Sequence, residues 1–367
     1  MATSSAAIER GEQMRELFPH LSQRVYLDTA AAGLCWKGHG AAVARFYEEV
    51  KNRGYDARPE WWAMTGKVRE RLAQWLGVTP QDITFVSNTT EGLNLAAHSI
   101  EFRKGDRVVC AQDEFPSVIR IWKAAERQGA ELVRVPIDRE EDRQARLMEG
   151  LAAGARVLVV SHTHSGTGTT LDLDTLGRHC RAHGTLFMVD GIQALGAVPT
   201  QLGQVDIYAS SFFKWMLSGF GFGILVTSPA AREAMAPAWQ GYANMDDAHQ
   251  LQYAHVNTPA LYGLDATLDL LEGIGWNTVF GRGRALGDQL VEQADRPGLP
   301  LATPREQRAG IFVFRAPDGE AARLRLAERG ISVSARGEGV RVSPHFYNST
   351  EDIERCASAL AEVLAAS

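Results

Sequence analysis

The feature that most constrains the fold is a regular alternation of short apolar runs with longer stretches of helical spacing between residues 80 and 226. Several of the runs contain few polar residues, as expected for strands that are buried on both faces of a sheet. Strands that alternate with helices predict a mostly parallel sheet between two layers of helices. The seven expected strands span residues 83–86, 107–110, 131–135, 157–160, 186–189, 205–208 and 222–226.

The pattern changes after about residue 240, where long helical runs precede short strand-like runs. Helices are expected at 259–273, at 276–294 and from Thr350 onward, and strands at 310–314, 330–334 and 340–342. This order predicts a smaller α+β domain. We therefore expect an α/β protein with a mostly parallel seven-stranded sheet in a large domain at 20–240, and a small domain formed by 1–19 and 241–367.

Composition excludes several classes of protein. The 367 residues carry a net charge of −6, which argues against a nucleic-acid partner because phosphate binding needs a basic field. No apolar run reaches the roughly 18–20 residues of a membrane span, and no signal peptide is recognised at the N-terminus. The four scattered cysteines are typical of isolated thiols in a reducing compartment, so we expect a cytoplasmic enzyme without a metal. They are Cys35, Cys110, Cys180 and Cys356.

Three polar sets follow expected strands, where ligands of open α/β sheets bind. Asp190 ends the apolar run 186–189, and it could pair with a ring nitrogen, bind a metal or cap a helix. Lys214 lies between Phe213 and Trp215, an apolar setting that would lower its pKa and favour a nucleophilic amine, although a surface lysine is an alternative. The segment 87–94 could form an anion site or an ordinary capping box.

In this order and at this spacing, the three sets resemble the class V aminotransferase family of fold-type I pyridoxal 5′-phosphate (PLP) enzymes. That family includes cysteine desulfurases, isopenicillin N epimerase-like proteins and kynureninase. The resemblance runs from Val25–Ala31 to Arg341–Asn348 and is most specific over 159–223. It implies a PLP enzyme with its cofactor held as a Schiff base on Lys214 and an amino acid as substrate.

The resemblance also implies roles for other residues. Asp190 would pair with the protonated pyridine nitrogen, and Gln193 would donate to the phenolic oxygen. Phe115 would stack on the ring in place of the histidine of many desulfurases. Arg341 would clamp the substrate carboxylate, near Ser165, which replaces a common asparagine. The phosphate would be held by Thr89, Thr90 and Ser211, with Thr258 reaching the phosphate of the neighbouring subunit.

The position of Thr258 implies a homodimer with shared active sites, and Arg53 resembles a residue that enters the site from the partner. Arg336 either binds a second substrate carboxylate or lies on a loop. A racemase would need a second base, for which Tyr55, His164 and Tyr242 are open alternatives. His162 and His164 are also typical of structural histidines at a strand end.

The reaction is constrained by what residues 332–339 lack. A desulfurase needs a nucleophilic cysteine on a mobile loop there, and the segment contains none. This favours chemistry that begins with removal of the Cα proton, as in epimerisation, β-elimination (a C–S lyase, for example) or transamination. Alternatives are a desulfurase with an atypical sulfur acceptor and a non-catalytic PLP-fold protein. A Rossmann-type NAD enzyme is disfavoured because the glycines at 219–223 precede a strand.

Overall fold

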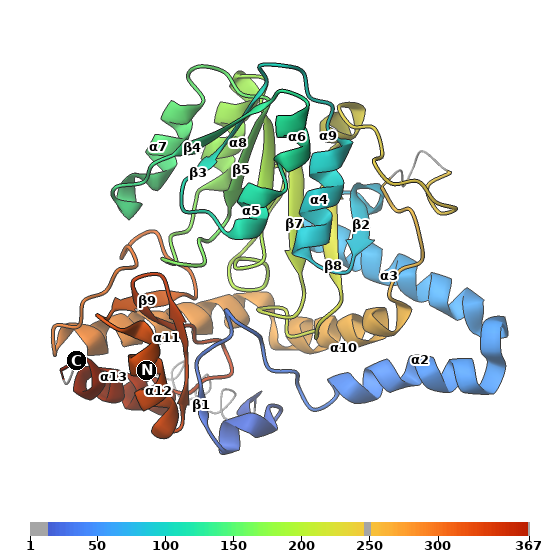
Figure 1. Cartoon of the computed structure of the whole chain (residues 1–367). Coiled ribbons are helices and arrows are strands. Elements are labelled where there is room, and N and C mark those ends of the chain that lie inside the picture. Colours follow the sequence, from blue (N-terminus) through green and yellow to red (C-terminus); the bar gives the residue numbers. More distant parts are fainter. Residues whose placement is uncertain (1–13, 246–250, 366–367) are drawn as a thin grey trace.

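The large sheet runs through the upper part of a computed structural model that describes residues 14–245 and 251–365 (Figure 1). Its strand order is β2-β8-β7-β6-β5-β3-β4. β8 is antiparallel to both of its neighbours and the remaining pairs are parallel, which confirms the predicted mostly parallel sheet. The strands are β2 (Ile83–Val86), β3 (Arg107–Ala111), β4 (Glu131–Val135), β5 (Val157–Ser161), β6 (Leu186–Asp190), β7 (Ile207–Ser211) and β8 (Gly223–Thr227).

Helices cover both faces of this sheet (Figure 1). No helix among the described residues is long and apolar enough to cross a membrane. The α-helices are α2 (His39–Arg53), α3 (Arg58–Leu76), α4 (Thr89–Ser99), α5 (Pro116–Arg120), α6 (Lys123–Arg127), α7 (Arg143–Gly150), α8 (Leu173–Ala182), α9 (Pro229–Glu233), α10 (Thr258–Ile274), α11 (Trp276–Asp295), α12 (Gly319–Glu328) and α13 (Thr350–Ala365). Single 3₁₀ turns are η1 (Pro19–Ser22), η2 (Gly54–Ala57), η3 (Pro80–Asp82) and η4 (Glu140–Asp142).

The central strands are buried along their whole length because side chains of alternate residues enter two separate cores. On β5, Val157 and Val159 pack in the core that contains Leu93 of α4. Leu158 and Val160, on the other face, belong to the core that includes residues of α3, α8 and α10. Continuous apolar strands therefore arise from burial on both faces, as the sequence predicts.

The seven-stranded sheet and the helices on its faces are called the large unit. The small unit is built on an antiparallel sheet in the order β11-β12-β9, which packs with α11, α12 and α13. A second, parallel pair joins β1 to β10. The strands are β1 (Val25–Tyr26), β9 (Phe312–Arg315), β10 (Ile331–Ser332), β11 (Ser334–Arg336) and β12 (Gly339–Val342).

The expected domain limits at residues 20 and 240 stay a prediction, but two elements pack across them. β1 pairs with β10 of the small unit, and α10 lies along α2 and contributes to the core of the large unit. One expected strand is also displaced. The run 205–208 begins as a strand only at Ile207, and just before it the N–H of Phe187 donates to the carboxylate of Asp206 rather than to a strand carbonyl.

Candidate active site

The candidate active site is a cavity of about 1000 Å³ at the carboxyl ends of the parallel strands, and both units contribute to its walls. Nine of the predicted site residues line it, which places the expected cofactor and substrate residues around one space. Their roles remain predictions. They are Thr89, Thr90, Phe115, Ser165, Asp190, Gln193, Ser211, Lys214 and Arg341.

Lys214 lies on the loop between β7 and β8, three residues after the buried end of β7. The loop is held by the segment after β1, where Gly33 donates its N–H to the carbonyl of Phe213 at 2.9 Å. A Cβ on Gly33 would lie 2.0 Å from the Lys214 carbonyl oxygen, so only glycine permits this contact. The backbone of the lysine is thereby fixed while its side chain lines the cavity.

The amine of Lys214 has no hydrogen bond or ion pair with any described residue; its nearest ring is Phe213, 5.6 Å from Nζ. Burial is the main cause that lowers the pKa of Lys214, and the positive charge of Arg341 lowers it further. Asp190 has the opposite shift, because burial raises its pKa while the N–H of Ile192 and the charge of Lys214 oppose the rise. A neutral amine thus becomes accessible at lower pH than for an exposed lysine.

Asp190 ends β6 and is 4% exposed, so its carboxylate needs polar partners. The described residues provide a single hydrogen bond, from the N–H of Ile192 to Oδ1 at 3.0 Å. The rest of the carboxylate is available to a ligand in the cavity. The alternative of a helix cap, open from the sequence, does not arise here because β6 is followed by a turn rather than a helix.

Hydroxyl groups gather where β2 meets α4. The Oγ of Ser211 accepts the N–H of Thr89 at 2.7 Å and lies 2.8 Å from its hydroxyl, and the hydroxyls of Thr90 and Ser117 are 2.9 Å apart. Asn88 caps α4 by accepting the N–H of Glu91 at 2.9 Å. The helix start and these hydroxyls together form a site suited to a small anion.

Gln193 is held rigidly beside the lysine loop. Its Nε2 donates to the carbonyl of Ala30 at 3.0 Å, and its Oε1 accepts the indole N–H of Trp215 at 3.0 Å. The carbonyl of Trp215 accepts in turn from Nε2 of His345 at 3.0 Å. Burial lowers the pKa of His345 to about 4, so this histidine is a neutral structural donor.

Arg341 is 2% exposed, and its ion pair with Asp28 is long. Its Nη1 donates to the carbonyl of Ser165 at 3.2 Å, its Nη2 lies 3.7 Å from Asp28, and its Nε has no partner among the described residues. Asp28 is bonded instead by the hydroxyl of Ser334, 2.7 Å from each carboxylate oxygen. Burial lowers the pKa of Arg341 to about 10, although Asp28 opposes the shift. A buried guanidinium in this state favours binding of a carboxylate.

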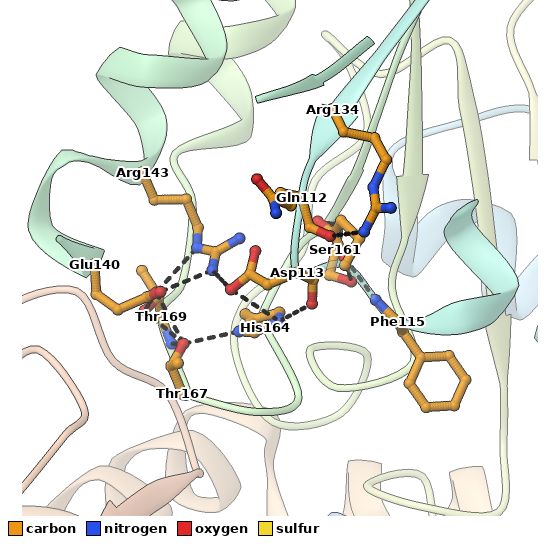
Figure 2. A network of polar contacts seen from close by, with 11 residues as sticks. Gln112, Asp113, Phe115, Arg134, Glu140, Arg143, Ser161, His164, Thr167 and Thr169 are labelled. Carbon is orange, nitrogen blue, oxygen red and sulfur yellow. Dashed lines mark hydrogen bonds and ion pairs between the residues drawn. The ribbon is translucent and has the colours of Figure 1, made fainter. Parts of the chain in front are cut away.

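An ion-pair network forms another wall of the cavity (Figure 2). Arg143 pairs with Asp113 at 2.5 Å and with Glu140 at 2.8 Å. Burial acts to raise the pKa of Glu140, but the hydrogen bond and charge of Arg143 outweigh it and lower that pKa to about 2. His164 donates from Nε2 to the carbonyl of Asp113 at 3.1 Å, and its Nδ1 lies 2.9 Å from the hydroxyl of Thr167.

Asp113, Glu140 and His164 place one potential metal-ligand atom each within 4.8 Å of one another. The guanidinium of Arg143 already pairs with both carboxylates, so the three side chains belong to an internal ion-pair network. His162 differs from His164: it is buried, does not line the cavity, and has its pKa lowered to about 4 by burial. The structural interpretation of the two histidines therefore fits His162 better.

Phe115 precedes α5 and is 45% exposed, with its ring directed away from the ion-pair network (Figure 2). The neighbouring Glu114 is 5% exposed and accepts from the N–H and hydroxyl of Ser161 at 2.9 and 2.6 Å. These bonds tie the loop after β3 to the end of β5. They place Phe115 at the cavity wall, on a fixed support.

Four residues considered from the sequence lie away from this cavity. Thr258 starts α10 and Arg53 ends α2, where it pairs with Glu60 at 2.7 Å. Neither lines the cavity, and their expected roles in a partner's site stay predictions. Tyr55 and Tyr242 are 63% and 59% exposed and do not line it either.

None of the four cysteines, all of which are among the described residues, lines the cavity. Cys110, Cys180 and Cys356 are buried, and Cys35 is exposed beside Gly219. Between β11 and β12 the chain turns through only Gly337 and Glu338. The turn leaves no length for a mobile cysteine loop.

The sequence did not identify Asp28, Glu114 or the Arg143 network as parts of this site. Asp28 and Glu114 lie within or beside stretches that carried the family resemblance, and that resemblance could have pointed to them. No sequence pattern pointed to Arg143, because its partners Asp113 and Glu140 come from separate loops.

Comparison with known proteins shows the family. A sequence model described as Aminotransferase class-V matches residues 25–356. Isopenicillin N epimerase from Streptomyces clavuligerus is 28% identical over 81% of this chain and 84% of that protein. A probable cysteine desulfurase from Methanothermobacter thermautotrophicus is 25% identical over 96% of this chain and 98% of that protein.

Solved structures share the fold. A cysteine desulfurase from Thermococcus onnurineus NA1 aligns with a TM-score of 0.88 and 22% identity, covering 97% of this chain and 98% of that one. The cystine C–S lyase C-DES in complex with cysteine persulfide aligns with a TM-score of 0.88 and 22% identity, covering 94% and 99%. The fold is that of fold-type I PLP-dependent enzymes, as predicted.

Proposed function

Because the chain belongs to the class V aminotransferase family of PLP-dependent enzymes, we propose that it acts at the α-carbon of an amino acid through Lys214 and is not a cysteine desulfurase. The observation that carries the proposal is a cavity that contains Lys214, Asp190 and Arg341 but no cysteine. A desulfurase with an atypical sulfur acceptor, an aminotransferase and a non-catalytic PLP-fold protein are the alternatives.

The polar groups of the cavity fit PLP. Lys214 offers an amine without a partner among the described residues, and Asp190 offers a buried carboxylate with one hydrogen bond. A protonated ring nitrogen would give this carboxylate the cationic partner that its burial demands. Ser211 and Thr89 offer hydroxyls at the start of α4 for a phosphate. When bound, PLP supplies the electron sink for a charge that develops at Cα.

The residues of the chain would divide the remaining work. Lys214 would hold the cofactor covalently through Nζ and, once released, take the proton from Cα. Arg341 would bind the α-carboxylate bidentately and so fix which bond at Cα faces the cofactor. Phe115 would cover one face of the ring, and Gln193 would donate its remaining amide hydrogen to the phenolic oxygen.

Removal of the Cα proton begins epimerisation, β-elimination and transamination alike. The relatives include an isopenicillin N epimerase and a cystine C–S lyase, which supports the first two. Among the candidates for a second base, His164 lines the cavity, whereas Tyr55 and Tyr242 do not. Its two ring nitrogens are engaged by Asp113 and Thr167, so it would act mainly by shaping the wall.

We further propose a homodimer with shared sites, working in the cytoplasm. Thr258 and Arg53 lie outside the cavity of their own chain, which suits the expected roles across a dimer interface. Four cysteines without a disulfide are consistent with a reducing compartment. Sedimentation of the purified protein tests the dimer.

The proposal is tested first at Lys214. After incubation with PLP, borohydride should reduce a lysine-linked cofactor to a stable amine, and peptide mapping should find the added mass on Lys214. Lys214→Ala should lose the label and at least about a thousandfold in turnover, because it removes both the covalent anchor and the proton acceptor. Lys123→Ala, a surface variant, is the control and should keep both. A label on another lysine, or full turnover by Lys214→Ala, would overturn the assignment.

An amino-acid panel then tests the reaction. The holoenzyme should exchange the Cα hydrogen of an accepted amino acid for solvent deuterium, with formation of a D-isomer, a keto acid with ammonia, or a keto acid alone. Each product identifies one of the three reactions. Efficient transfer of sulfur from L-cysteine to a thiol of the protein would instead support the desulfurase alternative.

A further inference from the structure

The small antiparallel sheet presents several cations on one face. Ser334 of β11 is paired with Arg341 of β12, and Arg336 is paired with Gly339. Because paired residues of antiparallel strands point to the same side, and residues two apart on one strand share a face, Arg336 and Arg341 lie on one face. Arg315 of β9 is opposite Gly339 and shares this face. All three arginines line the cavity that contains Lys214.

The three arginines differ in their partners. Arg315 is held by Glu338 at 2.6 Å, and Arg341 by the carbonyl of Ser165 with Asp28 at 3.7 Å. The side chain of Arg336 is exposed to the cavity and makes no hydrogen bond or ion pair with any residue in 14–245 or 251–365. Its charge nevertheless contributes to lowering the pKa of Lys214 and of Arg341, so it lies close to the reacting end of the cavity.

We propose that Arg336 binds a second carboxylate of the substrate, so that the enzyme selects amino acids whose side chain ends in an acidic group. This inference rests on the proposed function, in which Arg341 holds the α-carboxylate. It adds a specificity-determining residue to that site and a substrate class to that reaction.

The spacing of the two arginines suits such a substrate. Arg341 on β12 is opposite Ser334 on the neighbouring strand β11. Arg336 lies two residues further along β11, which adds an offset of roughly 7 Å along the strand. The two carboxylate carbons of an amino acid with two or three side-chain methylene groups lie roughly 5–6 Å apart when extended, and the rotatable arginine side chains can close the remaining difference. The two-residue turn at Gly337 and Glu338 holds Arg336 on a hairpin, so its backbone is already in place and only the side chain must be ordered on binding.

The cavity also contains a competing cation. Arg139 lines it as well, is 71% exposed, and has its nearest carboxylates, on Glu141 and Asp142, at 3.9 Å. Arg139 is not on the small sheet and lies beside these acidic neighbours and the Glu140 network. The acidic surroundings make Arg139 the weaker candidate, and a variant at this position is the matched comparison.

The experiment uses the holoenzyme and two pairs of probes: L-glutamate with L-glutamine, and L-2-aminoadipate with L-norleucine. Dissociation constants are measured from the change in cofactor absorbance, which does not require turnover. We expect the acid of at least one pair to bind about tenfold more tightly than its neutral counterpart, the effect of one charge-assisted hydrogen bond. Arg336→Met should reduce this ratio to near one, Arg336→Lys should keep part of it, and Arg139→Met should keep it.

Equal affinity of the wild-type enzyme for both members of each pair overturns the proposal, as does loss of the ratio in Arg139→Met but not in Arg336→Met. The ratio of dissociation constants measured on the wild-type enzyme is decisive by itself, so poor folding of a variant cannot leave the proposal untested. Failure of the proposed function has a separate sign, which is the absence of a borohydride-stable label on Lys214. A labelled enzyme that prefers neutral amino acids rejects only the role of Arg336.

Discussion

The two sides of the cavity are built in different ways. The large unit supplies residues at the ends of parallel strands, and several of them are held by neighbouring side chains, as Thr89 is by Ser211 and Gln193 by Trp215. The small unit supplies an antiparallel face with Arg336, whose side chain has no ion pair among the described residues, and Arg341, whose ion pair with Asp28 is long at 3.7 Å. The difference indicates that the large unit is organised to hold a permanently bound cofactor, whereas the small unit offers positive charge to a substrate that binds and dissociates.

After Lys214→Ala, the largest effect should follow from a second change on the cofactor side. Asp190→Asn keeps the shape of the side chain but removes the negative charge that would keep the ring nitrogen protonated. We expect turnover, measured as Cα deuterium exchange, to fall by about 10²–10³-fold, the usual loss when one preorganised electrostatic partner is removed. Binding of PLP should weaken much less, because the phosphate site and Lys214 remain.

A matched control is Asp82→Asn. Asp82 is also buried in the large unit, but it pairs with Arg232 at 2.5 Å and does not line the cavity. This variant should lower the melting temperature while the folded enzyme keeps its turnover. Equal turnover in Asp190→Asn and the wild type would show that the carboxylate does not pair with the ring nitrogen of the cofactor. It would then contradict the assignment of the large unit to cofactor binding.

A smaller effect is expected on the substrate side. Arg341→Met removes the guanidinium, and kcat/KM should fall by about 10–100-fold, with KM raised and kcat lowered, because hydrogen bonds that bind and orient the α-carboxylate are lost. The lysine-linked cofactor should still form, as judged by borohydride labelling. Arg341→Lys keeps the charge but not the fork, and should recover part of the loss. A fall in kcat with unchanged KM would instead place Arg341 with the cofactor residues.

The same division explains what the sequence could predict. Buried strands and their polar ends are local patterns, and the carboxyl ends of parallel strands meet at one edge, so Asp190 and Lys214 could be expected near each other. Both line one cavity, while their roles stay predictions. The two-residue shift of the strand expected at 205–208 shows the limit of such patterns, because just before Ile207 a side-chain contact, from the N–H of Phe187 to the carboxylate of Asp206, stands in place of strand pairing.

The substrate side depends on contacts that no local pattern records. Asp28 meets Ser334 across 306 residues of sequence, and the position of Arg336 is fixed by the register of β11 with β12. From the sequence, Arg336 could equally bind a second carboxylate or lie on a loop. The pairing of β11 with β12 determines that the side chain of Arg336 is on the same face of the sheet as that of Arg341. No short sequence motif encodes this pairing.

The smallest effect is expected where a side chain contributes only apolar contact area to the cofactor. Phe115→Ala removes a flat apolar ring that would cover the cofactor, and stacking of this kind is worth about 0.5–1.5 kcal/mol. The dissociation constant of PLP, measured by titrating apoprotein, should therefore rise by about 2–10-fold. Leu324→Ala, at 50% exposure on α12 and outside the cavity, should leave it unchanged. A fall in turnover as large as that of Asp190→Asn would mean that Phe115 orients the cofactor, whereas an unchanged dissociation constant of PLP would place Phe115 with the substrate side of the cavity.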